Sequence, residues 1–241
     1  MNRPDWRFWG MVVLGVGMAL GGAFAGWGFA QGRAAERFVT VKGVSEREVR
    51  ADLAVWPLQV VAADNDLASA TAQLARGIAV VRDFMARQGL DTTQVALTAY
   101  SVEDAAANQW SSGVPQNRFV VRQTLVLRST LPDQVLAASQ RVSELASAGV
   151  AISSAGGTEG PTFLFTGLNE LKPEMIAEAT ARAREAAEQF ARDADSRLTG
   201  IRRANQGVFE ILARDQAPGI SPNGQVDKMV RVVSTIEYSL D

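Results

Sequence analysis

The chain has 241 residues, with 24 Lys and Arg against 26 Asp and Glu, and it contains neither cysteine nor histidine. Its net charge of -2 at pH 7 leaves no basic field that could hold nucleic acid, so we expect no nucleic-acid partner. The missing Cys and His exclude thiolate nucleophiles, disulfides, zinc–thiolate sites and every Ser-His-Asp arrangement. Beyond an apolar N-terminal segment, roughly 200 residues remain, which is enough for one large domain or two closely packed halves.

The N-terminal segment has the composition of a membrane-spanning helix. No charged side chain lies between Arg7 and Arg33. A helix from Trp9 to Phe29 would rise ~30 Å, about the thickness of one hydrocarbon core. We therefore expect a cytoplasmic N-terminus over residues 1–7, a transmembrane signal-anchor over residues 8–32, and a linker over residues 33–37.

Glycines and tryptophans within this segment support a membrane location. The glycines follow one another at steps of seven and four, which places them on one face of a helix where a second helix can approach closely. The tryptophans lie at the two ends, where indole rings favour the membrane interfaces. The predicted helix-packing residues are Gly10, Gly17, Gly21 and Gly28, and the predicted interface anchors are Trp6, Trp9 and Trp27.

A cleaved secretory signal is the alternative interpretation of the same segment. Arg3 and Arg7 would form its basic region, and Ala23-Phe24-Ala25 would form its cleavage site. A retained anchor is favoured, because the apolar run exceeds the usual ~7–15 residues of a signal sequence and has aromatic residues at both ends. Charges flanking the run are similar on both sides and set no orientation.

The next part of the chain predicts two strands and a helix. Residues 38–43 and 49–62 are rich in β-forming residues, and the polar residues 45–48 between them predict a turn. Pro57 cannot donate to a sheet ladder, and the apolar alternation shifts beside it, so we expect a bulge or an edge position there. Apolar residues at helical spacing from Leu67 to Met85 predict an amphipathic helix that ends at Gly89.

The remainder continues the alternation of strands and helices. Strands are predicted over 95–99, 119–127, near 162–165, 201–213 and 229–240, and a short helix opens at Thr130 and closes at Gly149. The longest helix is predicted from about Pro173 to Leu198. Its expected inner stripe is Ile176, Ala179, Ala183, Ala187, Phe190 and Ala194. The order of elements predicts an α+β fold.

These elements resemble the bacterial SIMPL-domain family. The likeness is carried by residues 38–43, the strand Ala51–Val55, the helix ending at Gly89, the alanine-rich helix 177–194 and the terminal strand 233–238. It covers nearly all of residues 38–241, which are accordingly expected to form one SIMPL-like domain of βαβ-type units with mixed or antiparallel sheets. The resemblance implies a periplasmic or membrane-anchored protein, assembly of some members into a ring with a central channel, and a link with oxidative-stress defence.

No group of residues in the sequence predicts catalysis, a cofactor or a metal site. The acidic pairs Asp64/Asp66, Glu103/Asp104 and Asp193/Asp195 lie at predicted element ends, where carboxylates cap helices or are solvated. The glycine-rich stretch 156–161 lacks the Gly-Lys-Ser/Thr of a phosphate loop and is interpreted as a turn. Trp110, in the loop 105–116, is a candidate contact residue for a subunit, a membrane or the domain itself.

These observations together predict a non-enzymatic, homo-oligomeric scaffold. Its single-pass helix would contact lipid in the inner membrane, and its C-terminal domain would lie in the periplasm. The alternative is a periplasmic binding module for a protein or envelope partner, with residues 1–25 removed as a signal peptide. Trp110 would then present the binding surface.

Overall fold

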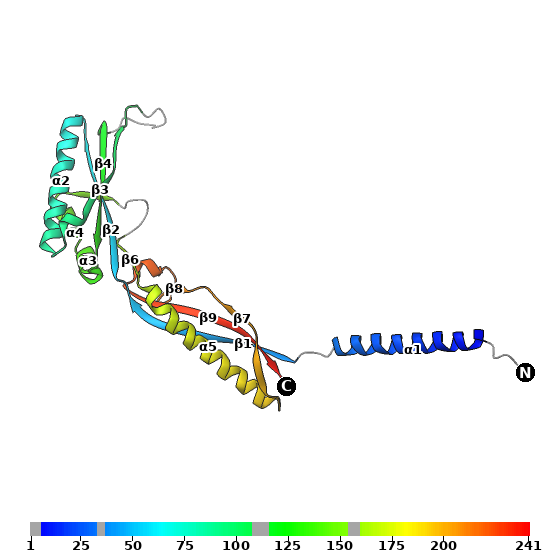
Figure 1. Cartoon of the computed structure of the whole chain (residues 1–241). Helices are drawn as coiled ribbons and strands as arrows, with labels where there is room; N and C mark the ends of the chain where they lie inside the picture. The colour runs from blue at the N-terminus through cyan, green and yellow to red at the C-terminus, as the bar shows by residue number, and fades with distance from the viewer. Residues whose placement is uncertain (1–5, 33–36, 108–115, 154–159) are drawn as a thin grey trace, which may run out of the picture.

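The computed structural model describes residues 6–32, 37–107, 116–153 and 160–241. The first element is the helix α1 (Trp6–Gly32), which extends away from the rest of the chain (Figure 1). Its described side chains, from Gly10 to Trp27, are all exposed. The remaining elements form two helix-covered antiparallel sheets, which confirms the predicted α+β class.

The sheet nearer to α1 has four strands and one covering helix. Its central strand β9 (Asp227–Leu240) pairs with β1 (Phe38–Arg50) on one side, and with β7 (Leu198–Gln206) and β8 (Glu210–Ala213) on the other. Helix α5 (Leu168–Asp193) covers one face of this sheet (Figure 1).

The second sheet has five strands in the order β3-β4-β2, with two short strands placed one after the other along the far edge of β2. Its strands are β2 (Leu53–Asp64), β3 (Val95–Asp104), β4 (Phe119–Ser129), β5 (Ala151–Ser153) and β6 (Thr162–Leu164). Helices α2 (Leu67–Arg87), α3 (Pro132–Gln140) and α4 (Ser143–Ser147) lie on one side of it (Figure 1). Short 3-10 helices, η1 (Thr92–Gln94) and η3 (Pro222–Gly224), precede β3 and β9.

Strand β1 runs without interruption through residues 45–48, so the predicted turn there was wrong. It pairs in register with β9 from Phe38 to Arg50, and the chain turns only at residues 51 and 52. Ser45 is fully buried, and its hydroxyl donates to Glu178 of α5. Polar residues inside this strand therefore have partners across the sheet–helix interface, which is why a polar run did not mark a loop.

Strand β2 keeps one register with β4 along its whole length, so of the two alternatives predicted at Pro57, a bulge or an edge position, the bulge is absent. On its other side β2 pairs with β6 at Leu53–Val55 and with β5 at Gln59–Val61. Pro57 lies in the gap between these two stretches. No carbonyl of a described strand faces Pro57 there, so its missing N–H breaks no hydrogen bond of the described sheet on this side. The register shift occurs instead in β3, between Thr98 and Ser101.

Helix α2 confirms the predicted helix and its end. The Asp66 side chain accepts a hydrogen bond from the Ser69 N–H and caps the first turn, and Gly89 adopts a positive φ of 77° after the last turn. The single helix predicted between Thr130 and Gly149 is divided into α3 and α4. The three-residue strand β5 was not predicted, because such a short segment carries no periodic signal.

Helix α5 starts earlier than predicted, and its inner face agrees with the predicted stripe at Ala179, Ala183 and Ala187 but not at its ends. It begins at Leu168, with Pro173 in its second turn, and ends at Asp193. Phe190 and Ala194 of the predicted stripe are exposed. The buried residues recur at steps of four and are Met175, Ala179, Ala183, Ala187 and Ala191.

The strand predicted over residues 201–213 is interrupted at Gly207. A Cβ on this glycine would lie 2.6 Å from the carbonyl oxygen of Val233, so only glycine allows β7 to leave β9 there. The chain rejoins β9 as β8.

The interior follows the division into two sheets. The larger core lies between the second sheet and α2, and it includes Trp56, Phe84, Leu125 and Leu127. Two smaller clusters lie under α5, one around Met175 and one around Ala183. The two halves meet end to end where β1 passes into β2 (Figure 1).

Candidate functional site

Helix α1 is one candidate site. Residues 10–27 are long and apolar enough to cross a membrane, a property that an anchor and a signal sequence share. Space is open around Gly10, Gly17 and Gly21, where an added Cβ would meet nothing within 4 Å, and Trp27 is 65% exposed. The helix includes Trp6, Trp9 and Gly28, whose side chains lie outside the described part of the chain.

A second set of glycines on α1 was missed in the sequence. Gly15, Gly22 and Gly26 repeat the same steps of seven and four, and space is open around each of them as well. At about 100° per residue this set lies roughly 140° around the helix from Gly10 and Gly17. The signal that predicted the first set could have found the second one.

The junction between the two sheets is held by backbone hydrogen bonds and by one carboxylate. At the turn between β1 and β2, the N–H of Ala51 donates to Val226 and the N–H of Asp52 donates to Leu164. The Asp52 carboxylate accepts hydrogen bonds from the N–H of Thr166 at 2.9 Å and from the N–H of Gly167 at 3.1 Å. Because Gly167 is the N-cap residue of α5, Asp52 caps this helix from a distant part of the sequence.

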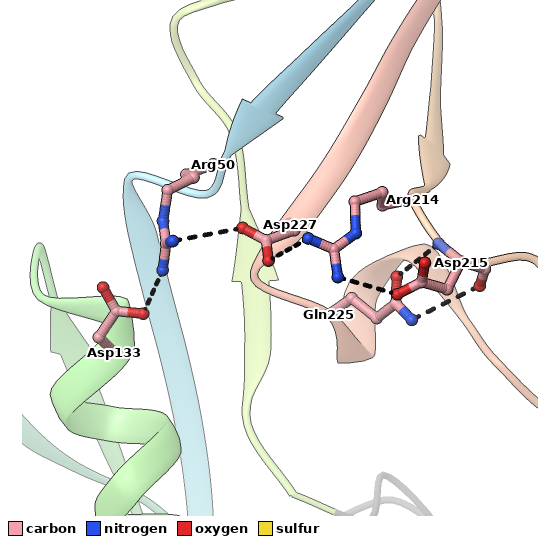
Figure 2. Close-up of polar contacts among 6 residues, drawn as sticks. All are labelled: Arg50, Asp133, Arg214, Asp215, Gln225 and Asp227. Carbon is pink, nitrogen blue, oxygen red and sulfur yellow. Dashed lines mark hydrogen bonds and ion pairs between the residues drawn. The ribbon is translucent and has the colours of Figure 1, made fainter.

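A row of alternating charges crosses the junction (Figure 2). Arg50 contacts Asp133 of α3 at 2.5 Å and Asp227 of β9 at 3.5 Å. Arg214 contacts the same Asp227 at 2.9 Å and Asp215 at 3.1 Å. The hydrogen bond with Asp215, together with the charge of Asp227, raises the pKa of Arg214. This row joins the helix side of one sheet to the central strand of the other.

Lys228 lies in β9 next to this row, and its burial was not predicted. Its side chain is buried and donates a hydrogen bond to the carbonyl oxygen of Pro222 in η3. Burial lowers the pKa of Lys228. The contact holds the loop between β8 and β9 against the sheet.

A second polar cluster lies between β1 and α5. Ser45 donates to Glu178 at 2.7 Å, Arg47 donates to Glu174 at 2.8 Å, and Arg182 donates to Glu178 at 2.5 Å. The hydrogen bond from Ser45, and then the charges of Arg182 and Arg47, lower the pKa of Glu178, although burial opposes them. The hydrogen bond and charge of Glu174 raise the pKa of Arg47.

A cavity of about 330 Å³ opens beside Pro57, in the gap between β5 and β6. Apolar side chains of Trp56, Leu58 and Val142 form much of its wall. Hydroxyl groups come from Ser139, Ser143 and Ser153. The cavity has the size of a small-molecule pocket, with mixed apolar and hydroxyl walls.

Among the acidic pairs singled out in the sequence, three carboxylates cap a helix or form ion pairs, and Asp64 and Asp193 accept hydrogen bonds from Gln73 and Gln189. Asp66 caps α2, and its hydrogen bonds with Ser69 lower its pKa. Glu103 pairs with Arg122, and Asp104 pairs with Arg118, whose hydrogen bond lowers the pKa of Asp104. Within the described residues no group of three or more acidic side chains is placed to hold a metal ion. Trp110 and residues 156–159 lie outside the described ranges.

Two solved structures show a weak likeness to the chain. An amidase of the hydantoinase/carbamoylase family from Burkholderia phymatum has 16% identity and a TM-score of 0.32 over 56% of this chain. The match spans 35% of the amidase, about a third of its length. An uncharacterized conserved protein from Listeria innocua has 14% identity and a TM-score of 0.15, over 78% of this chain and 91% of its own.

Comparison of the sequence with family models identifies one family. No curated protein matches the chain. The family model described as "SIMPL: Protein of unknown function (DUF541)" matches residues 39–235, which include every strand of both sheets in whole or in part. Over this range the match agrees with the resemblance seen in the strand ends and in the alanine-rich helix α5. The chain therefore belongs to the SIMPL family.

Proposed function

We propose that this chain is a non-enzymatic scaffold that is anchored in the inner membrane by α1 and self-associates through α1 and its domain. The domain projects into the periplasm. The observation that carries this proposal is the exposure of α1. All of its described residues are exposed, although nearly all are apolar. Such a helix is stabilised by lipid or by copies of itself.

The glycines of α1 support self-association within the membrane. Open space around Gly17 and Gly21 leaves room for the backbone of a second helix. The second set, at Gly15, Gly22 and Gly26, gives each helix a further face of the same kind. A helix with two such faces can contact two neighbours, as a ring requires.

The edge strand β3 supports self-association of the domain. Among the described residues it pairs only with β4, so its other edge carries backbone groups that no described strand pairs. Leu97, Tyr100 and Val102 on this strand are large and exposed. Contact with a second copy would pair the free backbone groups and bury these side chains.

A structural role is supported by the use of the charged groups. The described acidic residues at the junction and on β1–α5 form ion pairs or caps, as given above, and the SIMPL family model carries no named activity. The link with oxidative-stress defence, which the family resemblance implied, stays a prediction.

Particle size in mild detergent tests the proposal. Mass photometry of the full chain should show one large species, and Gly17→Leu with Gly21→Leu should reduce its size, because leucine side chains separate the helices. The matched control is Val12→Leu with Val16→Leu, on another side of α1, which should leave the size unchanged. A monomeric wild type would overturn the proposal, and an unchanged double glycine variant would overturn the part assigned to α1.

A binding module is the second candidate function, and the cavity beside Pro57 favours it. A periplasmic ligand or envelope component with an apolar group and a hydrogen-bonding group would match walls made of Trp56 and serine hydroxyls. This function needs no oligomer and is compatible with a cleaved N-terminus. A monomeric particle whose ligand binding is lost on Ser143→Leu, which fills the cavity, would favour it over the scaffold.

A further inference from the structure

The end of the domain at which α1 is attached carries a group of exposed apolar side chains. Three elements meet there, namely the first residue of β1, the last turn of α5 and the strand β7. Each presents one large apolar residue that is at least half exposed: Phe38 at 50%, Phe190 at 57% and Ile201 at 52%. We call this surface the tether end.

The register of the sheet places these residues at one level, with Phe38 and Ile201 on opposite faces of the sheet, because their partners in β9 are consecutive residues. Phe38 is opposite Ser239 of β9, and Ile201 is opposite Tyr238 on the other side of β9. Phe190 follows Ala187, which packs with Tyr238 in the small core of this end. The tether end therefore lies at the extremity of the domain, close to the C-terminus of the chain (Figure 1).

A short connection keeps the tether end near the membrane. Helix α1 ends at Gly32 and β1 begins at Phe38. The six Cα–Cα steps from Gly32 to Phe38 span at most about 22 Å even when fully extended. If α1 crosses the bilayer, this length limits the distance between the end of α1 and the tether end. The limit is about the depth of one lipid headgroup layer and a few water layers.

The chemistry of the tether end suits a headgroup region. The guanidinium of Arg202 lies over the ring of Phe38, 5.0 Å from its centre, so a cation and an aromatic ring share one position. Strand β7 carries Arg202 and Arg203 and no acidic residue. Aromatic rings and arginines are favoured together at the level of lipid headgroups, where the ring meets acyl chains and the cation meets phosphates.

We propose that the tether end is a membrane-docking surface, which lies on the lipid headgroups of the bilayer that α1 crosses and holds the domain in a fixed orientation. This inference rests on the proposed function, since it requires α1 to be in the membrane. The occupant is the lipid surface itself. Docking would bury the exposed apolar side chains and leave the second sheet directed away from the bilayer.

Fluorescence of the full chain in vesicles tests this proposal. The sequence contains no cysteine, so one introduced thiol gives a single label. Gly200 on β7 and Gly224 in η3 form a matched pair, because an added Cβ would meet nothing within 4 Å at either. Gly200 lies at the tether end, and Gly224 lies at the junction, about 40 Å away along β1.

Each variant, Gly200→Cys or Gly224→Cys, is labelled with an environment-sensitive dye and reconstituted in vesicles of phosphatidylcholine and phosphatidylglycerol. Lipids that carry a headgroup-level quencher should quench the dye at position 200 at least twofold more than the dye at position 224. Adding Phe190→Ser and Ile201→Ser to Gly200→Cys should remove the difference. Leu131→Ser with Val208→Ser, which changes exposed apolar residues elsewhere, should leave it intact.

Flotation of the same vesicles separates the two proposals. If the chain floats with the vesicles but the two positions are quenched alike, the docking surface is wrong and the anchor stands. If quenching at position 200 survives Phe190→Ser with Ile201→Ser, the named side chains do not dock, and the proposal is overturned. If the chain does not float, the anchor fails and the docking surface fails with it.

Discussion

Gly43 of β1 and Ala179 of α5 are in such close contact that a methyl group on Gly43 would lie 1.8 Å from the backbone oxygen of Ala179. The same methyl group would lie 2.6 Å from the backbone nitrogen of Ala183. Both obstacles are backbone atoms, which cannot rotate away as a side chain can. The alanine stripe of α5 and this glycine therefore set the distance between the helix and its sheet.

We expect Gly43→Ala to destabilise the domain by about 1–3 kcal/mol or more, because the helix has to move off the sheet. Urea unfolding of the full chain in detergent, followed by circular dichroism, measures the change. The matched control is Gly200→Ala, also a strand glycine but with open space around it, which should change stability by less than about 0.5 kcal/mol. Equal effects at both positions would contradict the close packing of α5.

Asp52 gives a second prediction, because it caps α5 from the turn between β1 and β2. Asp52→Ala leaves the N–H groups of Thr166 and Gly167 without this acceptor and should cost about 1 kcal/mol, with Asp52→Asn costing less. Asp83→Ala is the control, since it removes an exposed carboxylate that pairs with Arg87 within one helix. That control should cost no more than about 0.5 kcal/mol. An equal cost for both alanine variants would show that the cap contributes nothing.

Glu178 predicts how the stability of the domain changes in acid. Its pKa is lowered in the folded chain, chiefly by the hydrogen bond from Ser45, so the ionised form stabilises the fold. This contribution is complete above the unfolded pKa, about 4.3, and is lost as the pH falls through the lower folded value. The advantage of wild type over Glu178→Gln should therefore be constant from pH 7 to 5 and shrink below about pH 4.

Unfolding midpoints of both proteins across this pH range provide the measurement. Ser45→Ala removes the largest cause of the shift, so in that background the loss should be smaller and should be complete at a higher pH. An advantage of wild type that does not change with acid would contradict the role given to Ser45.

The row of charges at the junction predicts coupling between two arginines. Arg50 and Arg214 contact opposite oxygens of Asp227, so each affects how firmly the other holds it. In a double-mutant cycle, Arg50→Gln and Arg214→Gln should be non-additive, and the coupling should disappear in Asp227→Asn. Asp215→Asn, which removes only the outer partner of Arg214, should preserve most of the coupling. Additive effects in the wild-type background would mean that Asp227 does not join the two halves.

The sequence predicted the elements with long, regular patterns. The helix α2, its end at Gly89 and the alternation of Val230, Val232, Ile236 and Tyr238 in β9 were all visible, because each repeats over several turns or residue pairs. Elements without such a repeat were missed or misplaced. The three residues of β5 carry no period, and Pro173 was taken as the start of α5 because proline is favoured in the first turn, whereas the helix begins five residues earlier at Leu168.

The polar features of the interior could not be predicted, because they depend on contacts between distant parts of the chain. Residues 45–48 looked like a turn until α5 supplied partners for Ser45 and Arg47. Asp52 accepts a hydrogen bond from Thr166, and Arg50 donates one to Asp133. These residues lie 114 and 83 positions apart in the sequence, so no local sequence pattern predicts the contacts. The first set of glycines on α1, at positions 10, 17, 21 and 28, was visible for the opposite reason, since a helix face is defined by spacing alone.

The proposed scaffold keeps α1 and assembles through it, and one sample tests both properties. Full-length protein extracted in mild detergent is measured by mass photometry, and an intact-mass spectrum of the same sample locates its N-terminus. We expect one large, uniform particle whose subunits retain residues 1–25. A small particle that begins after Ala25 would contradict this expectation, and would identify the chain as a secreted monomer for which the binding-module function is the better proposal.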